Sequence, residues 1–250
     1  MTTELSALAN VGSLEWLTQT GGHLSRRERS YLLRGVFPMI RDGFRLRRAA
    51  KRSGGRDVAL EHFEPPQTPI VQLAREYLAE HCGRAMVNHS YRTAFWTLVV
   101  LGQHTEVTPR VLETTWVAAL LHDVGLEVPP QHGDFSLGGV QVLQSFAHEL
   151  GWSEQQTHEA GEAIAVNLTT RADPARVGMI AWAMNAAGAG ELGIWPHRAQ
   201  MARARITELE QRYPRDGFRK VALKLIRDEA RRLPDGRFAL FKPVYWLLMR

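Results

Sequence analysis

The stretch WVAALLHDVGL, residues 116–126, decides the fold prediction for this chain. An uninterrupted apolar run leads into His122 and Asp123, and Gly125 follows at once. An imidazole and a carboxylate at the exit of a buried helix are costly unless something pairs with them. Because imidazole and carboxylate together suit divalent metals, we predict a metal site here. Gly125 is expected to let the chain leave the helix in a left-handed conformation.

A second segment, VNHSYRTAFW at residues 87–96, supplies another histidine at an expected helix start, where Asn88 or Ser90 would cap. Arg92 lies one turn after His89, so both side chains can face one cavity. A guanidinium there would neutralise an anionic substrate or brace a ligand carboxylate, and it would serve equally well as a structural ion-pair partner. A histidine–aspartate pair alone is common by chance, and the second histidine strengthens the metal hypothesis.

The whole chain predicts an all-α fold. Val, Ile and Thr do not gather into alternating runs, whereas apolar residues recur at spacings of three and four. The helices expected in the main domain span residues 70–82, 89–103, 109–122, 137–150, 153–167, 174–185, 196–212 and 217–233. Capping signals precede three of them: Thr108 before Pro109, Ser153 with Gln156, and Asp173 before Pro174.

Composition limits the classes of protein that fit. The single cysteine, Cys82, excludes an internal disulfide and suits a reducing compartment. No apolar run is long enough to span a membrane. The N-terminus lacks the basic and apolar regions of a secretory signal. We therefore expect a cytoplasmic globular protein.

The net charge of +5 is concentrated near the N-terminus. Between His23 and Arg56, eleven Lys or Arg residues stand against Glu28 and Asp42 alone, so the rest of the chain is mildly acidic. This pattern is typical of a solvated helix face. It also suits an anionic partner such as RNA, a membrane surface or an acidic protein.

Ser25 and Glu28 form a capping box that predicts the start of a basic helix running towards Leu46. Pro38 and Gly43 should kink or interrupt this helix.

Two breaks follow the basic helix: KRSGGRD at residues 51–57 and PPQTP at 65–69. We predict a basic helical extension over residues 1–65 and a helical metal-binding domain over 66–250. The apolar C-terminal segment FKPVYWLLMR, residues 241–250, is a candidate for docking on the domain or on a second copy of the chain.

Four segments carry a family resemblance: NHSYRTAFW (88–96), AALLHDVGL (118–126), FSLGGVQVLQSF (135–146) and EAIAVN (162–167). In this order they resemble the HD-domain superfamily, and most closely its branch of cyanamide hydratase and related metal-dependent phosphohydrolases. The resemblance covers about residues 66–240 and implies an HD-domain bundle of antiparallel helices around a metal.

Carried over residue by residue, the resemblance makes His89, His122 and Asp123 metal ligands. It places Phe135 and Gly139 beside the site. Zinc is the expected ion, with iron, manganese or nickel as alternatives.

Two positions depart from the family pattern. Asn167 stands where the branch usually has a histidine, and Leu192 stands where it has an aspartate ligand. Glu191, one residue earlier, is the nearest carboxylate and would be the fourth ligand. His132 and Asp134, in the loop after the HD helix, would compensate if they reach the site.

These residues predict a hydrolase or hydratase that uses metal-activated water on a small nitrile-like or phosphorylated molecule. The candidate catalytic residues are Asp123, His132 and Arg92, and the candidate substrate contacts are Arg92, Asn167 and Phe135. The alternative is a binding or regulatory module whose metal site has degenerated and whose basic N-terminal segment recognises an anionic partner. A specialised biosynthetic enzyme with a remodelled pocket lies between the two.

Overall fold

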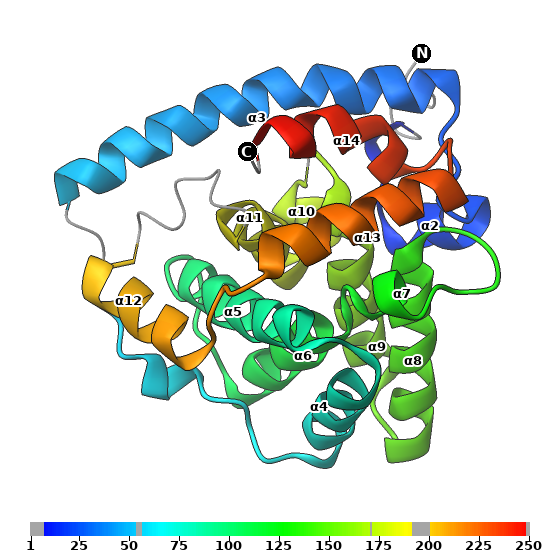
Figure 1. The fold of residues 1–250 in the computed structure, drawn as a ribbon. Coiled ribbons are helices and arrows are strands. Elements are labelled where there is room, and N and C mark those ends of the chain that lie inside the picture. Colours follow the sequence, from blue (N-terminus) through cyan, green and yellow to red (C-terminus); the bar gives the residue numbers. More distant parts are fainter. Residues whose placement is uncertain (1–7, 54–56, 171, 192–200, 249–250) are drawn as a thin grey trace.

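The computed structural model describes residues 8–53, 57–170, 172–191 and 201–248. These residues form helices joined by loops and contain no β-strand, so the predicted all-α class is confirmed (Figure 1). In chain order the helices are α2 (Leu14–Thr20), α3 (Arg26–Ser53), η1 (Leu60–Phe63), α4 (Pro69–His81), α5 (Arg84–Leu101), α6 (Pro109–Leu121), α7 (Val124–Glu127), α8 (Phe135–Leu150), α9 (Glu154–Ala165), η2 (Val166–Leu168), α10 (Pro174–Val177), α11 (Met179–Glu191), α12 (Arg203–Arg212), α13 (Phe218–Arg232) and α14 (Arg237–Leu248).

Local signals in the sequence set several helix starts. The capping box at the start of α3 forms in full, because Ser25 N–H donates to Glu28 Oε2 (2.7 Å) and Glu28 N–H donates to Ser25 Oγ (3.3 Å). Thr108, Ser153 and Asp173 each accept a hydrogen bond from a backbone N–H of the following turn. The capping predictions at these four helices are confirmed.

The helices α5, α6 and α11 form the centre of the molecule. Every residue of α5 from His89 to Leu101 is buried except Tyr91, and so is α6 from Thr114 to Leu121. A helix that is covered on all sides belongs in the core. Because the second turn of α5 lies beside the end of α6 in the interior, the two helices can hold polar side chains away from bulk water.

The start of α5 corrects one prediction. The helix begins at Arg84 after the N-cap Gly83, and not at His89 with a cap at Asn88 or Ser90. The first turn, before His89, is less buried than the part of the helix that follows it. His89 therefore lies in the second turn, where the backbone is fixed on both sides.

Helix α3 continues through Pro38 and Gly43, so the predicted interruption is absent, whereas a kink stays a prediction. A proline within a helix removes the donor to the carbonyl four residues earlier. That carbonyl belongs to Arg34, which is exposed, so water can satisfy it.

Gly125 corrects a third prediction. It is absent from the residues with positive φ, and the chain passes from Asp123 directly into the short helix α7. A Cβ at Gly125 would overlap the backbone of Phe135, and one at Gly139 would overlap the Leu121 carbonyl. The two glycines therefore allow the start of α8 to pack closely against the segment that carries the histidine–aspartate pair.

The remaining helix boundaries are close to those predicted. The segment 174–185 is divided into α10 and α11 at Gly178, and the segment 196–212 is described as a helix from Arg203 onwards. The N-terminal helices share the core, because Leu17 and Leu32 are fully buried in one cluster with α5 and α6. The boundary between residues 1–65 and 66–250 stays a prediction.

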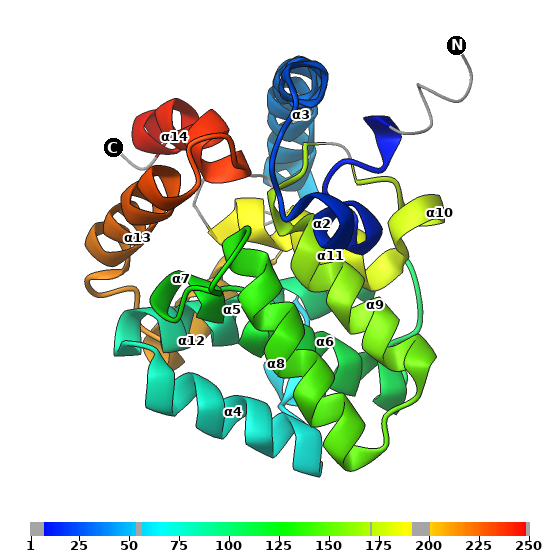
Figure 2. The same cartoon turned by 90° about the vertical axis from the view of Figure 1, so that its right-hand side faces the viewer.

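Figures 1 and 2 place α3 along one edge of the molecule, and Figure 2 shows α2 beneath it and α14 to one side. In the described part of the chain, no helix has the length and apolarity that a membrane span requires.

Candidate metal centre

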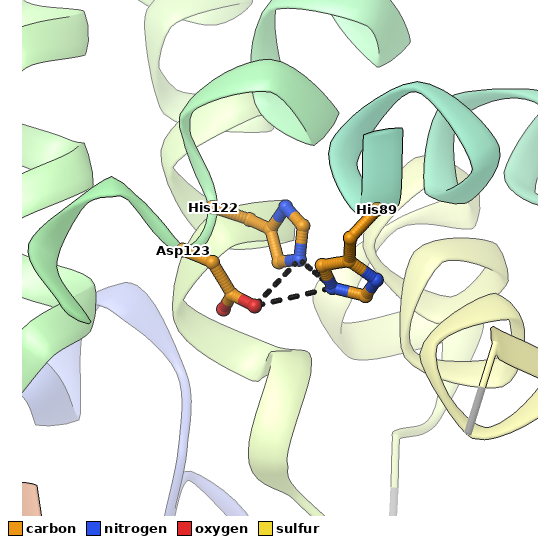
Figure 3. Close-up of side chains that lie close together, drawn as sticks. All are labelled: His89, His122 and Asp123. Atoms are coloured by element: carbon orange, nitrogen blue, oxygen red, sulfur yellow. Dashed lines mark hydrogen bonds and ion pairs between the residues drawn. The ribbon is translucent and has the colours of Figure 1, made fainter. Parts of the chain in front are cut away.

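Helix α5 and the end of α6 bring His89, His122 and Asp123 together (Figure 3). His89 Nε2, His122 Nε2 and Asp123 Oδ2 form a triangle in which each pair of atoms is 3.2 Å apart. His122 is the C-cap residue of α6, and Asp123 follows it directly. Because the chain turns there into α7, two adjacent residues can direct their side chains to one point.

The hydrogen bond at the far side of the His122 ring fixes what this ring presents to the triangle. His122 Nδ1 lies 2.6 Å from the carbonyl oxygen of Ala119, and a carbonyl can only accept. The proton of the neutral ring is therefore on Nδ1, and Nε2 presents its lone pair to His89 and Asp123. This is the arrangement in which metal-binding histidines are usually held.

The three converging atoms fit a divalent ion. With both rings neutral, at most one proton, on His89 Nε2, is shared by three acceptor atoms. Three atoms spaced 3.2 Å apart can all lie about 2 Å from a single point, which is the distance of zinc from nitrogen and oxygen ligands. Two imidazoles and one carboxylate also form a ligand set that leaves further coordination positions open.

The charge state of Asp123 follows from its neighbours. Burial alone would raise the pKa of this carboxyl, but His122 and His89, when they carry protons on Nε2, hold it well below its usual range through the charge of His122 and hydrogen bonds to the carboxylate. Asp123 is therefore an anion that faces two imidazoles. A divalent cation would replace the protons on which this low pKa depends.

Helix α13 covers one side of the triangle. The ring of Phe218 stacks on that of His89, with a centroid distance of 4.6 Å and an interplanar angle of 21°. Arg92, predicted to contact substrate, is fully buried and donates to the carbonyls of Tyr213 (2.8 Å) and Pro214 (3.0 Å). Its guanidinium therefore fixes the connection that leads into α13.

The turn η2 covers another side. Asn167 Nδ2 lies 3.5 Å from Asp123 Oδ1, so the predicted substrate contact is beside the carboxylate. The amide of Asn185, on α11, donates to the carbonyls of Val166 (2.8 Å), Asn167 (3.3 Å) and Thr169 (3.0 Å). Asn185 thus fixes the turn that carries Asn167. It was not singled out in the sequence, because no local motif marks it.

The other predicted site residues lie as follows. His132 is exposed in the loop before α8, outside the cluster. Phe135 is fully buried at the start of α8, where its N–H donates to Glu229 Oε1 (3.0 Å). Glu191 ends α11, but its side chain and the whole of Leu192 are outside the described residues.

Asp134 belongs to a different cluster. Its carboxylate pairs with the fully buried Arg237, which donates through Nη2 to Oδ1 (2.8 Å) and through Nε to Oδ2 (3.2 Å). Arg237 also donates to Ser136 Oγ (2.8 Å) and to the carbonyl of Ala165. This pair joins the loop before α8 to α14.

A scan against protein-family models finds no match to this chain, and neither does a search of curated proteins.

Proposed function

We propose that this chain is a divalent-metal-dependent hydrolase or hydratase of the HD type that acts on a small nitrile-like or phosphorylated molecule. One observation carries the proposal. The lone pair of His122 Nε2, fixed by the Ala119 carbonyl, is directed at His89 Nε2 and Asp123 Oδ2, each 3.2 Å away. These three atoms can be balanced by a shared proton or by a divalent cation, and we propose the cation.

His89, His122 and Asp123 would hold the ion, with zinc as the first candidate and iron, manganese or nickel as alternatives. Such an ion lowers the pKa of water and polarises an electrophile. Asp123 Oδ1, the oxygen that faces Asn167, remains able to accept a proton or a hydrogen bond. The Asn167 amide would orient either that carboxylate or a polar group of the substrate.

The burial of the site favours a small substrate. His89 and His122 are 5% and 1% exposed, and the Asp123 side chain is 12% exposed. Such an enclosed site excludes bulk water and strengthens electrostatic interactions inside it. Nitrile hydration and phosphate-ester hydrolysis both meet these conditions, since each needs one activated water and one polarised electrophile.

The primary test is metal analysis of protein purified without chelator. We expect about one divalent ion per chain in the wild type, and none in His122→Ala. His148→Ala is the matched control, because it removes an exposed histidine from α8. A wild-type protein that takes up no zinc, iron, manganese or nickel would falsify the proposal.

Turnover assays then separate the two substrate classes. The wild type is tested on cyanamide and small nitriles, and separately on a panel of phosphate monoesters. His122→Ala is the negative control, and activity with one class identifies the reaction. If the protein binds its ion yet converts neither class of substrate, the proposed metal site stands and both proposed reactions are excluded. A protein that binds no ion, converts neither class and binds an anionic partner would instead support the alternative, a module whose metal site has degenerated.

A further inference from the structure

The outer face of α3 carries a long row of arginines. Arg27, Arg34, Arg41, Arg45 and Arg48 are all exposed. Their spacings of seven, seven, four and three residues place them on one side of a helix. At about 1.5 Å per residue the row is roughly 32 Å long.

Two exposed apolar side chains lie beside this row. Leu33 is 48% exposed and Phe37 is 73% exposed. They are four residues apart, so they are neighbours on the helix surface, and Arg41 lies one further turn along from Phe37. Exposed Leu or Phe side chains beside a basic helix face are typical of helices that lie in a membrane interface.

The opposite face of α3 is attached to the body of the protein. Glu28 Oε1 accepts a hydrogen bond from Trp16 Nε1 (2.7 Å), and the Leu32 carbonyl accepts one from Thr170 Oγ1 (2.9 Å). Arg29 donates to the carbonyl of Pro234 (3.0 Å). In Figures 1 and 2 the outer side of α3 faces away from the other helices. The protein therefore presents this face in a fixed direction.

We propose that the outer face of α3 binds an anionic lipid bilayer, with the helix lying parallel to the membrane surface. Leu33 and Phe37 would enter the boundary between headgroups and acyl chains. The arginine side chains have long apolar stems, so they can reach phosphate groups while the helix lies at that depth. A nucleic acid would also attract the row, but it would gain nothing from an exposed leucine beside it. This combination of side chains therefore favours a bilayer.

The experiment is sedimentation of the full chain with large unilamellar vesicles. One set contains phosphatidylglycerol in phosphatidylcholine, and the other contains phosphatidylcholine alone. We expect binding to the first set only, and weaker binding as salt is added, because salt screens the attraction. Equal binding to both sets would contradict the charge complementarity on which the proposal depends.

Variants then locate the surface. Arg34→Glu with Arg48→Glu reverses two charges of the row and should weaken binding at least about tenfold. Lys220→Glu with Arg227→Glu makes the same change of charge on exposed positions of α13, and should change binding by less than about threefold.

Phe37→Ser tests the apolar contribution without changing the charge. Binding to anionic vesicles should fall several-fold, and the loss should persist at high salt because burial of the ring is not screened. Circular dichroism checks that each variant keeps its helices. The proposal is overturned if vesicle binding survives Arg34→Glu with Arg48→Glu, or if Phe37→Ser leaves it unchanged. Binding to single-stranded RNA without binding to vesicles also overturns it.

Discussion

The candidate metal site of His89, His122 and Asp123, which we call the metal cluster, and the Asp134–Arg237 pair both lie in the interior. They satisfy their charges in different ways. Arg237 donates to both oxygens of Asp134, and also to Ser136 and Ala165, so donors and acceptors complement each other within the protein. Asp134 is in addition the N-cap of α8, since it accepts from the N–H of Ser136 (2.9 Å). This pair is complete as it stands.

The metal cluster consists of acceptors directed at one another. His89 Nε2, His122 Nε2 and Asp123 Oδ2 each lie 3.2 Å from the other two. Burial of ionisable groups is thus common to both clusters and does not identify a functional site. A surplus of acceptors at one point favours one, because an added proton or metal ion is needed to balance it.

The largest effect is expected where the complete pair is broken. Arg237→Ala leaves Asp134 buried without its cation, which should cost about 3–5 kcal/mol in the free energy of unfolding. Arg231→Ala, on a side chain 70% exposed, should cost less than about 0.5 kcal/mol. Urea denaturation followed by circular dichroism measures both. A loss below about 1 kcal/mol for Arg237→Ala would mean that water already reaches the pair.

The metal cluster should respond to zinc instead. A zinc concentration about 100-fold above the dissociation constant should stabilise the wild type by about 2.7 kcal/mol. His122→Ala should lose this gain, while His148→Ala retains it. Arg237→Ala should still gain stability from zinc if it remains folded, because the pair and the metal cluster share no ligand. Thermal unfolding with zinc and with chelator provides the data. An equal gain in His122→Ala would place the ion elsewhere.

The sequence reveals the metal cluster more readily than the complete pair. His122 and Asp123 are adjacent at the end of an apolar run, and His89 is followed by a second apolar run, so short motifs bring all three to attention. Helix caps such as Ser25 with Glu28 are equally local. The all-α class and these caps were therefore predictable from residue spacing alone.

Contacts between distant residues could not be predicted in this way. Arg237 is 103 residues from Asp134, and Asn185 is 18 residues from the Asn167 carbonyl that it binds. Nothing near either residue indicates its partner. The prediction for Gly125 was wrong for the same reason, because the close approach of Phe135 depends on tertiary packing.

A moderate effect is expected at Asn185, which supports the metal cluster indirectly. Asn185→Ala removes the donor to three carbonyls around η2 and should cost about 1–2 kcal/mol in stability. Because the turn carries Asn167, zinc affinity should also fall, by about tenfold. Gln144→Ala, at an exposed position of α8, is the control. Zinc titration by calorimetry measures the affinity. If Asn185→Ala loses stability but binds zinc as tightly as the wild type, Asn185 does not support the metal cluster.

The smallest effect is expected at Glu162, a buried carboxylate whose neighbours do not outweigh the effect of its burial. Its Oε2 accepts a hydrogen bond from the N–H of Leu14 (2.8 Å). Burial outweighs this bond and raises the pKa of Glu162. At Asp123, in contrast, the neighbouring histidines lower the pKa of the carboxyl.

Because the folded state favours the protonated form of Glu162, its contribution to stability is full below the unfolded pKa of about 4.3 and is lost as pH rises through the folded pKa. Glu162→Gln keeps an acceptor for Leu14 and does not titrate. Its stability relative to the wild type should therefore increase from pH 4 to pH 7, by less than about 1 kcal/mol. Glu149→Gln, at an exposed position of α8, should show no such trend. If the stability of Glu162→Gln relative to the wild type instead decreases from pH 4 to pH 7, the folded protein stabilises the charged form of Glu162. Burial would then not raise the pKa of this carboxyl.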